Sequence, residues 1–370
     1  MSLPGADGQP FRYSAPVLAD RAVRVVFGTG CLAEVVSEAH TLGRRVMIIS
    51  GRHEVAAAEL VAAQLGGDLV WRVSEVVQHV PVEVAARSIA AAREVKADVV
   101  VSIGGGSATG LAKAVARDIG LPIVAVPTTY AGSEMTPIWG QTDHGEKTTG
   151  RDPQVLPRTV VYDPALTTSM PADLTAASGM NALAHAVESL YAPDATPESL
   201  EVAEEAIRAL AHGLPDAVSW PDDLNARTST QRGAWLAGWA LGSTTMGLHH
   251  KLAHLLGGTY HLPHAGVHSA LLPQLAAFNA PSAPGAFSRA ARGLGVSGPE
   301  AVGPALFELA AQLQAPTSLA ELGLDWDAIP VVAKVIGATP ISNPRDYTEQ
   351  DVRSLVEQAY LGNKPPPERN

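Results

Sequence analysis

The sequence is poor in cysteine, in aromatic residues and in charge. Its 370 residues include one cysteine, Cys31, so the chain can form neither an internal disulfide nor a cysteine metal cluster. Charged residues make up 17% of the chain and the formal net charge is −11. A protein that binds a phosphate backbone needs a basic surface, so this balance argues against nucleic acid as a partner. A small anionic substrate needs only a local positive pocket and is compatible with the composition.

The sequence also lacks a long apolar run. No stretch approaches the roughly 20 apolar residues that cross a bilayer, and residues 1–13 contain no signal-peptide core. We therefore expect a cytoplasmic protein with no membrane partner. Hydrophobic residues make up 46% of the chain, which is enough for a large core, and the length predicts two domains.

The hydrophobic pattern changes near residue 168. Apolar stretches alternate with helical segments before this point, and they predict strands at 23–27, 45–50, 69–73, 98–103, 122–126 and 160–162. Such alternation predicts an α/β domain with a Rossmann-like parallel sheet over 1–168, preceded by a polar tail at 1–15. Alanine- and leucine-rich segments predict an all-α domain over 169–370, with helices at 180–192, 197–213, 229–256, 267–278, 300–313 and 349–360.

Two polar loops follow neighbouring strands of the predicted sheet. The first consists of Gly104, Gly105, Gly106 and Ser107, and the second contains Thr128 and Thr129. Glycines let the backbone approach an anion, and the first N–H groups of the following helix would point at it. A glycine triplet alone after a strand is more often a tight turn. The threonine hydroxyls would meet the same ligand at the carboxyl edge of the sheet, which favours a dinucleotide site.

The end of the strand at 45–50 bears on the choice of cofactor. A carboxylate there often favours the nicotinamide cofactor without a 2′-phosphate. Gly51 and Arg52 occupy this position, and the arginine could tolerate a 2′-phosphate or be an ordinary surface charge. The choice between NADH and NADPH therefore stays open.

Half of the twelve histidines lie between residues 247 and 268. These six are His249, His250, His254, His261, His264 and His268. His250 and His254 are four residues apart and would share one face of a helix. Gly257 and Gly258 predict the end of that helix, and Pro263 would preset a turn that carries His264. We expect a helix face and a following loop to point imidazoles into one cavity.

Five longer segments carry a family pattern. They are GGGSATGLAKA (104–114), VPTTYAGSEMTPIWG (126–140), KTTGRD (147–152), SGMNALAHAVESLYAP (178–193) and LHHKLAHLLGGTYHLPHA (248–265). Together they resemble the iron-containing alcohol dehydrogenase superfamily and, within it, most closely the maleylacetate reductases. The resemblance implies reduction of the C=C bond of maleylacetate to 3-oxoadipate by NADH or NADPH, in aromatic catabolism, by a homodimer. It also places Gly51 and Ser133 with the two polar loops in the cofactor site.

Asn181 departs from the metal-binding members of that superfamily. With His185, His250 and His264 it resembles a four-ligand metal site in which those members carry an aspartate. Asparagine offers only a neutral carbonyl oxygen, which is a poor partner for iron or zinc. We therefore expect no metal. Three histidines could still hold zinc, so a metal-dependent alcohol dehydrogenase is the alternative.

Without a metal, the expected reaction needs proton donors. Hydride addition to the alkene leaves negative charge on the ketone oxygen, and a donor aimed at that oxygen lowers the barrier. Imidazoles titrate near neutral pH, and we assign this chemistry to His250 and His254. Asn181, His185 and His264 are predicted to line the substrate pocket.

The two carboxylates of such a substrate need cationic partners. Lys251, Lys147 and Arg151 are candidates, with a solvated surface charge as the alternative for each. Tyr130 is predicted to bond the substrate or the nicotinamide amide, with simple packing as the alternative.

The substrate itself has alternatives. Gly266 and Ile341 stand where the resembling reductases commonly carry polar or bulky residues. A reductase of another unsaturated or oxo acid is therefore also compatible with the sequence. A binding protein that has lost catalysis is the alternative from a different functional class.

Overall fold

The computed structural model describes residues 11–18, 21–143 and 146–366. The chain divides into two compact units, Met1–Met170 and Pro171–Asn370, close to the boundary predicted at residue 168. We call them unit 1 and unit 2. No helix in the described ranges is long and apolar enough to cross a membrane. The cytoplasmic location stays a prediction.

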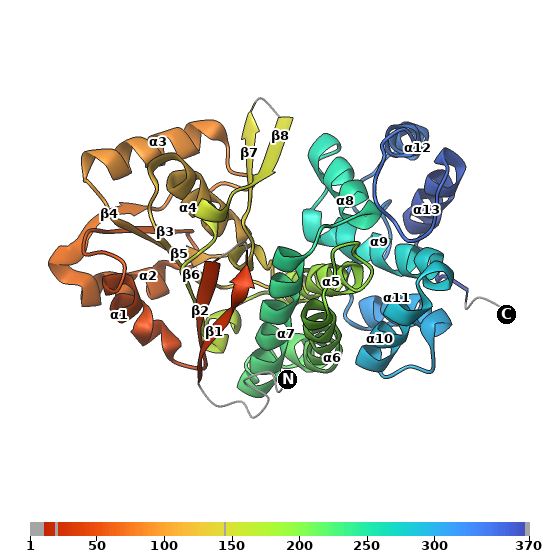
Figure 1. The fold of residues 1–370 in the computed structure, drawn as a ribbon, viewed down its shortest axis with the longest axis horizontal. Coiled ribbons are helices and arrows are strands. Elements are labelled where there is room, and N and C mark those ends of the chain that lie inside the picture. The colour runs from red at the N-terminus through yellow and green to blue at the C-terminus, as the bar shows by residue number, and fades with distance from the viewer. Residues whose placement is uncertain (1–10, 19–20, 144–145, 367–370) are drawn as a thin grey trace. The chain divides into compact units, whose positions relative to one another are not determined.

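Unit 1 is built on a seven-stranded sheet of order β1-β2-β9-β6-β5-β3-β4 (Figure 1). Its strands are β1 (Phe11–Leu18), β2 (Arg21–Phe27), β3 (Val46–Ser50), β4 (Leu69–Val73), β5 (Val99–Gly104), β6 (Ile123–Pro127) and β9 (Thr159–Tyr162). β1 is antiparallel to β2, and the other neighbouring pairs are parallel. Strands β3, β5 and β6 are apolar runs that are buried along their whole length, as expected of a covered parallel sheet. The predicted α/β class is confirmed.

Helices cover both faces of this sheet (Figure 1). On one face lie α1 (Val35–His40) and α2 (Val55–Leu65), and on the other lie α3 (Val82–Glu94) and α4 (Gly106–Ile119). Val61 of α2 packs with Ile48 and Val101 of the sheet in a dry core. Because both faces are covered, the accessible backbone of the central strands lies at their ends, where a ligand can bind.

Two features of unit 1 were not predicted. The prediction of a polar tail at 1–15 is wrong from Phe11 onward, because β1 pairs with β2 and the Phe11 ring stacks on Phe27 at 5.2 Å between centroids. Residues 1–10 lie outside the described ranges. The segment after β6 contains an antiparallel hairpin of β7 (Ile138–Asp143) and β8 (Glu146–Arg151). Its strands are mostly polar, so no alternation of apolar residues announces them.

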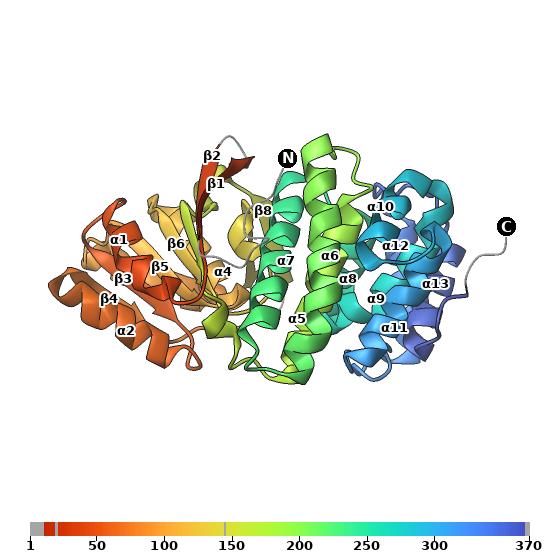
Figure 2. The same ribbon diagram turned by 90° about the horizontal axis from the view of Figure 1, so that it is seen from below.

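Unit 2 is all-α, as predicted. Its helices are α5 (Ala172–Ser189), α6 (Pro197–Ser219), α7 (Leu224–Ser243), α8 (Leu248–Thr259), α9 (His264–Asn279), α10 (Pro284–Leu294), α11 (Val302–Gln312), α12 (Ile329–Gly337) and α13 (Glu349–Leu361). Helices α5, α6 and α7 run side by side (Figure 2). The predicted single helix at 229–256 is two helices, because the backbone is extended at Thr244. The short helices α10 and α12 were not predicted.

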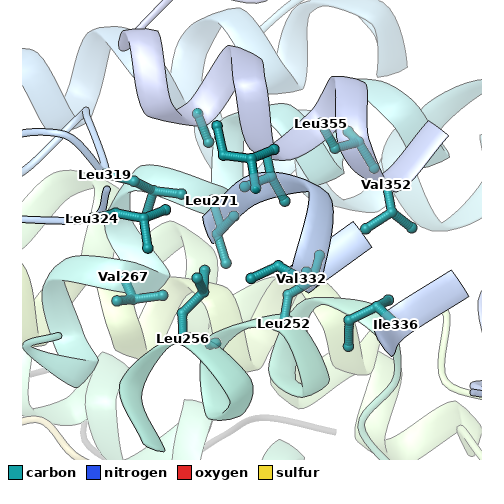
Figure 3. Close-up of a cluster of buried hydrophobic side chains, with 14 of the residues drawn as sticks. Leu252, Leu256, Val267, Leu271, Leu319, Leu324, Val332, Ile336, Val352 and Leu355 are labelled. Carbon is teal, nitrogen blue, oxygen red and sulfur yellow. The ribbon is translucent and has the colours of Figure 1, made fainter. Parts of the chain in front are cut away.

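A leucine-rich core holds α8 and α9 against α12 and α13 (Figure 3). Leu252 and Leu256 of α8 pack there with Leu271 of α9, and all three are fully buried. Each such side chain stabilises the fold by about 1.5–3 kcal/mol on burial. This core fixes the two helices that carry most of the histidine-rich stretch.

Candidate active site

In unit 1 the glycine loop joins β5 to α4 at the carboxyl edge of the sheet. Gly104 has a φ of 147°, a conformation that favours glycine. A Cβ on Gly105 would lie 2.9 Å from Cγ2 of Thr129, so the loop packs directly against the threonine loop. Gly105 precedes α4 and has no side chain to cap it, which leaves the first N–H groups of α4 for an anion.

The predicted cofactor residues follow three neighbouring strands. Gly51 follows β3, Gly105, Gly106 and Ser107 follow β5, and Thr128 and Thr129 follow β6. The N–H of Thr128 donates to the carbonyl of Gly104 at 3.2 Å, which joins the last two loops. Ser133 lies further along the chain, on the short 3-10 helix Ser133–Met135. The sheet order therefore brings the first six residues to one edge.

Glu54 belongs to this edge and was missed from the sequence. Its Oε1 accepts a hydrogen bond from Oγ1 of Thr128 at 3.1 Å. Its Oε2 lies 2.7 Å from the position that a Cβ on Gly51 would take, and its Cδ lies 3.5 Å from the corresponding position on Gly104. From the sequence, only the residues directly after β3 were considered for a carboxylate. The side chain of Glu54 instead reaches the end of β3 from the start of α2.

Lys113 is a second residue that was missed, although it lies in the motif that follows the glycine loop. It is fully buried on α4, and its Nζ donates to the carbonyls of Ser133 (2.6 Å), Thr136 (2.8 Å) and Ile138 (2.7 Å). Burial lowers the pKa of Lys113 to about 7, and nearby Glu134 acts in the opposite direction. This ammonium ties down the segment that carries Ser133.

Tyr130 lies in the core of unit 1, and its predicted contact with the substrate or the nicotinamide stays a prediction. Its side chain is fully buried in unit 1, and its hydroxyl lies 3.4 Å from Oγ1 of Thr167. Arg151 is exposed on β8, and the side chain of Lys147 lies outside the part of the chain that is described.

Helices α5, α8 and α9 bring histidines together in unit 2. His185 of α5 stacks on His250 of α8 with ring centroids 5.1 Å apart, and His250 lies 4.7 Å from His268 of α9. His249 stacks on His268 at 4.9 Å, and their Nε2 and Nδ1 atoms lie 3.1 Å apart. Asn181 lies one helical turn before His185 on α5 and is also buried. We call these five residues, Asn181, His185, His249, His250 and His268, the buried polar cluster.

The end of α8 and the start of α9 differ from the positions that the sequence predicted. The helix of His250 continues through Gly257 and Gly258 and ends at Thr259, because the leucine core holds that last turn in place. His264 does not lie in a loop but is the first residue of α9, after Pro263. His268 therefore follows one turn later on the same helix, which explains why it reaches the cluster.

Glu188 organises the start of α8 and was also missed. Its carboxylate accepts hydrogen bonds from the N–H groups of Gly247 (3.1 Å), His249 (3.0 Å) and His250 (3.3 Å). Its Oε2 also forms a short hydrogen bond with Nδ1 of His250. Glu188 is 1% exposed and lies one turn after His185 on the same face of α5. A negative charge at this helix N-terminus is favoured by the exposed N–H groups.

Burial shifts the pKa values of this cluster in consistent directions. It lowers the pKa of His185 and of His249 to about 3, and the neighbouring histidines add to the effect. It also lowers the pKa of His250 and His268. For Glu188, burial raises the pKa to about 7, against the opposing effect of the backbone N–H groups. The imidazoles are therefore neutral near pH 7.

Several buried polar atoms of the cluster have no hydrogen-bond partner among the described residues. They are Oδ1 of Asn181, Nδ1 of His185, Nδ1 of His249, Nε2 of His250 and Nε2 of His268. An unsatisfied buried polar group destabilises the folded protein by about 1–3 kcal/mol, so such groups are rare and usually bind a ligand or water. This concentration of open atoms marks the cluster as a binding site for a polar molecule.

The remaining predicted residues of unit 2 lie at the border of the cluster. His254 is exposed, and its ring lies 6.2 Å from that of His250 and 5.7 Å from that of His264. His264 is half-buried and lies 4.6 Å from His268. Lys251 is exposed on α8, beside His250 in the chain. The predicted histidines His185, His250, His254 and His264 are thus brought together, with His250 inside and His254 at the surface.

The donor set of this cluster lacks a negatively charged ligand for iron or zinc, and the absence of a metal stays a prediction. The family position of a negative ligand holds Asn181, whose Oδ1 is neutral. We derive no step through a metal ion.

Comparisons with known proteins agree on the relatives of this chain. The family described as "Iron-containing alcohol dehydrogenase" matches residues 22–164, and the "Fe-containing alcohol dehydrogenase family, C-terminal" matches residues 175–360. The maleylacetate reductase of Sphingobium indicum is 48% identical over 92% of this chain and 96% of its own, and that of Burkholderia cepacia is 47% identical over 93% and 97%. The crystal structure of maleylacetate reductase from Agrobacterium tumefaciens superposes with a TM-score of 0.89 at 41% identity. The match covers 96% of this chain and 100% of that one.

Proposed function

The chain belongs to the iron-containing alcohol dehydrogenase family, and from this premise we propose that it reduces the C=C bond of maleylacetate to 3-oxoadipate without a bound metal. It is a nicotinamide-dependent oxidoreductase. Similarity to maleylacetate reductases over more than nine-tenths of the chain supports the substrate. The neutral Asn181 in the buried polar cluster supports the absence of a metal.

One observation carries the mechanism: the buried hydrogen bond between Glu188 and Nδ1 of His250, which leaves Nε2 of His250 open. The pKa of Glu188 is raised to about 7, so its carboxyl group can be protonated and donate a hydrogen bond to Nδ1 of a neutral ring. A neutral imidazole that accepts at Nδ1 carries its own hydrogen on Nε2. His250 is thereby prepared as a donor without bearing a buried charge.

The reaction balances with one hydride and one proton. A bound nicotinamide would supply hydride to the alkene carbon that is β to the ketone, and the electron pair of the double bond would then form an enolate. Nε2–H of His250 donates to the developing enolate oxygen, which stabilises the charge. The proton of Nε2 then passes to the carbon next to the ketone, the ketone re-forms, and 3-oxoadipate is complete. When Nε2 gives up its proton, Nδ1 can take the proton of Glu188, so the ring is never left as an anion.

The other open atoms of the cluster suit the substrate. Oδ1 of Asn181 and Nδ1 of His185 lie on one face of α5 and can fix the orientation of a polar substrate. His264, His254 and Lys251 lie at the border and would meet its carboxylates, where cationic or N–H donors are favourable. We propose His250 as the proton donor in chemistry and assign His254 to binding.

Gly266 packs against the core of unit 2. A Cβ on Gly266 would lie 2.9 Å from Cδ2 of Leu322, so the space beside this glycine is already filled by the core. The absence of a larger residue at this position therefore does not enlarge the substrate pocket.

The decisive assay follows nicotinamide oxidation with maleylacetate, with fumarate and a 2-oxo dicarboxylate as other substrates. We expect turnover of maleylacetate that is undiminished after chelator treatment. Turnover that disappears on chelation and returns with iron or zinc would overturn the metal-free mechanism. Turnover of the other acids alone would overturn the substrate.

We also propose a homodimer, as expected from the resemblance. β1 is an edge strand of the sheet in unit 1, and an edge strand is a natural site for pairing with a second copy. Light scattering of the purified protein at several concentrations tests this, and a mass of one chain at all of them would refute it.

A further inference from the structure

The strand order of unit 1 contains a switch point between β3 and β5. The chain leaves β3 through α2 and returns on one side as β4, whereas it leaves β5 through α4 and returns on the other side as β6. In an open parallel sheet, ligands bind at the carboxyl ends of the two strands where the connections diverge. Here those ends are Ser50–Gly51 and Gly104–Gly105, and Figure 1 shows β3 and β5 as neighbours in the sheet.

The carboxylate of Glu54 stands at this switch point. Its Oε2 lies 2.7 Å from the Cβ position of Gly51, and its Cδ lies 3.5 Å from that of Gly104. Glu54 is the N-cap residue of α2, yet its side chain makes no capping hydrogen bond. It is instead held from β6, because Oγ1 of Thr128 donates to its Oε1 at 3.1 Å.

Gly51 explains how a carboxylate from position 54 can occupy this place. A Cβ on residue 51 would push Oε2 of Glu54 aside, so glycine at this position leaves the space to the carboxylate. The space at the strand end that a carboxylate would take in other dinucleotide-binding sheets is therefore filled from the next helix. Glu54 is half-buried, so it can still reach a ligand.

We propose that Glu54 accepts hydrogen bonds from the ribose hydroxyls of the adenosine half of the cofactor and selects NADH over NADPH. This rests on the proposed function only in requiring a nicotinamide cofactor. Two vicinal hydroxyls match the two oxygens of a carboxylate. A 2′-phosphate would instead bring about −2 charges against this carboxylate in a partly buried place, where like charges repel strongly.

Arg52 is the competing determinant. It is adjacent to Gly51 in the chain and exposed, and a flexible arginine could neutralise a 2′-phosphate. Glu54, unlike Arg52, is held by Thr128 and covers the ends of both switch-point strands. The fixed group decides the preference, because it needs no ordering when the cofactor binds.

The test measures Kd for NADH and for NADPH by quenching of protein fluorescence, with no substrate present. We expect wild-type protein to prefer NADH by at least about tenfold, and Glu54→Gln to remove most of that preference by weakening NADH and strengthening NADPH. Glu59→Gln is the matched control, since Glu59 is an exposed carboxylate on α2 that pairs with Arg72, and it should leave both constants unchanged.

Two further variants make the result decisive. Gly51→Ala keeps Glu54 but displaces its carboxylate, so NADH affinity should fall as in Glu54→Gln. Arg52→Gln should leave the preference for NADH intact. The proposal is overturned if wild-type protein prefers NADPH, or if Glu54→Gln leaves the ratio of the two constants unchanged. Because the assay needs no turnover, inactivity toward maleylacetate would overturn the proposed substrate and leave this test standing.

Discussion

Glu188 and His250 lie 62 positions apart in the chain, and their side chains form a buried hydrogen bond between Oε2 and Nδ1. Glu188 also accepts the N–H of His250 itself, so it fixes both the backbone and the ring of the same residue. This double attachment directs Nε2 of His250 away from the carboxylate and into the buried polar cluster. The proposed donor is thus oriented by a neighbour that need not touch the substrate.

Glu188→Gln should uncouple proton supply from proton donation. The amide can still donate to Nδ1 and keep hydrogen on Nε2, but it cannot release a proton to the ring. We expect kcat to fall about tenfold to a hundredfold, with little change in cofactor affinity, and the pH dependence of kcat near pH 7 to be lost. Asp173→Asn, on the exposed start of α5, is the matched control. An unchanged pH profile in Glu188→Gln would rule out a role for this carboxyl proton.

His250→Ala and His254→Ala should differ in kind. His250 is buried with an open Nε2, so its loss should lower kcat by roughly 10²- to 10⁴-fold, the range of general acid catalysis, without weakening the cofactor. His254 is exposed, and its loss should chiefly raise the KM for substrate. Steady-state kinetics with cofactor Kd measured separately distinguishes them. Equal losses of kcat in both variants would contradict the separate roles.

Asn181→Asp should create a metal site. A carboxylate would supply the negative ligand that the cluster lacks and offset part of the cost of a buried cation. We expect iron or zinc to remain with the purified variant at near one ion per chain, and only traces with wild type, by elemental analysis. Asn181→Ala is the control that removes the amide without adding charge. Equal metal content in all three proteins would show that position 181 does not control metal binding.

Acid should destabilise unit 2 before most carboxylates titrate. His185 and His249 have folded pKa values of about 3, below the ordinary 6.5, so the unfolded chain binds more protons between these limits and stability falls as the pH falls. The contribution of each of these two histidines to the free energy of unfolding should fall by about 2 kcal/mol between pH 6.5 and pH 5. Glu188 has a raised pKa, so its contribution to the free energy of unfolding rises as the pH falls over this range. This rise offsets the loss from one of the two histidines. His250 and His268 shift in the same direction as the other histidines, so the net change is a loss.

Urea unfolding at these two pH values measures this loss. His249→Asn removes one titrating ring and should show a shallower dependence on pH than wild type, whereas the exposed His212→Asn should not. A free energy of unfolding that is equal or higher at pH 5 would contradict buried neutral histidines.

The sequence by itself determined the class of each unit. The runs at β3, β5 and β6 are almost entirely apolar, as is typical of buried parallel strands. Spacing also placed Asn181 with His185 and His250 with His254, because residues four apart share a helix face. The sequence did not predict β7 and β8, because their residues are mostly polar and the two strands pair through their backbones. The predicted end of α8 at Gly257 and Gly258 was too early. Glycine disfavours a helix, but packing of α8 in the leucine-rich core outweighs this preference.

Only the tertiary structure decided which polar residues meet. Glu54 reaches the cofactor edge through the order of strands, and Glu188 reaches His250 because α5 lies against the start of α8. The same packing put His250 inside the cluster and left His254 exposed, although both lie on the predicted helix face. Local periodicity specifies the direction of a side chain relative to its own helix. Its partner and its burial depend on chain segments tens of residues away, and those are fixed only when the core has packed.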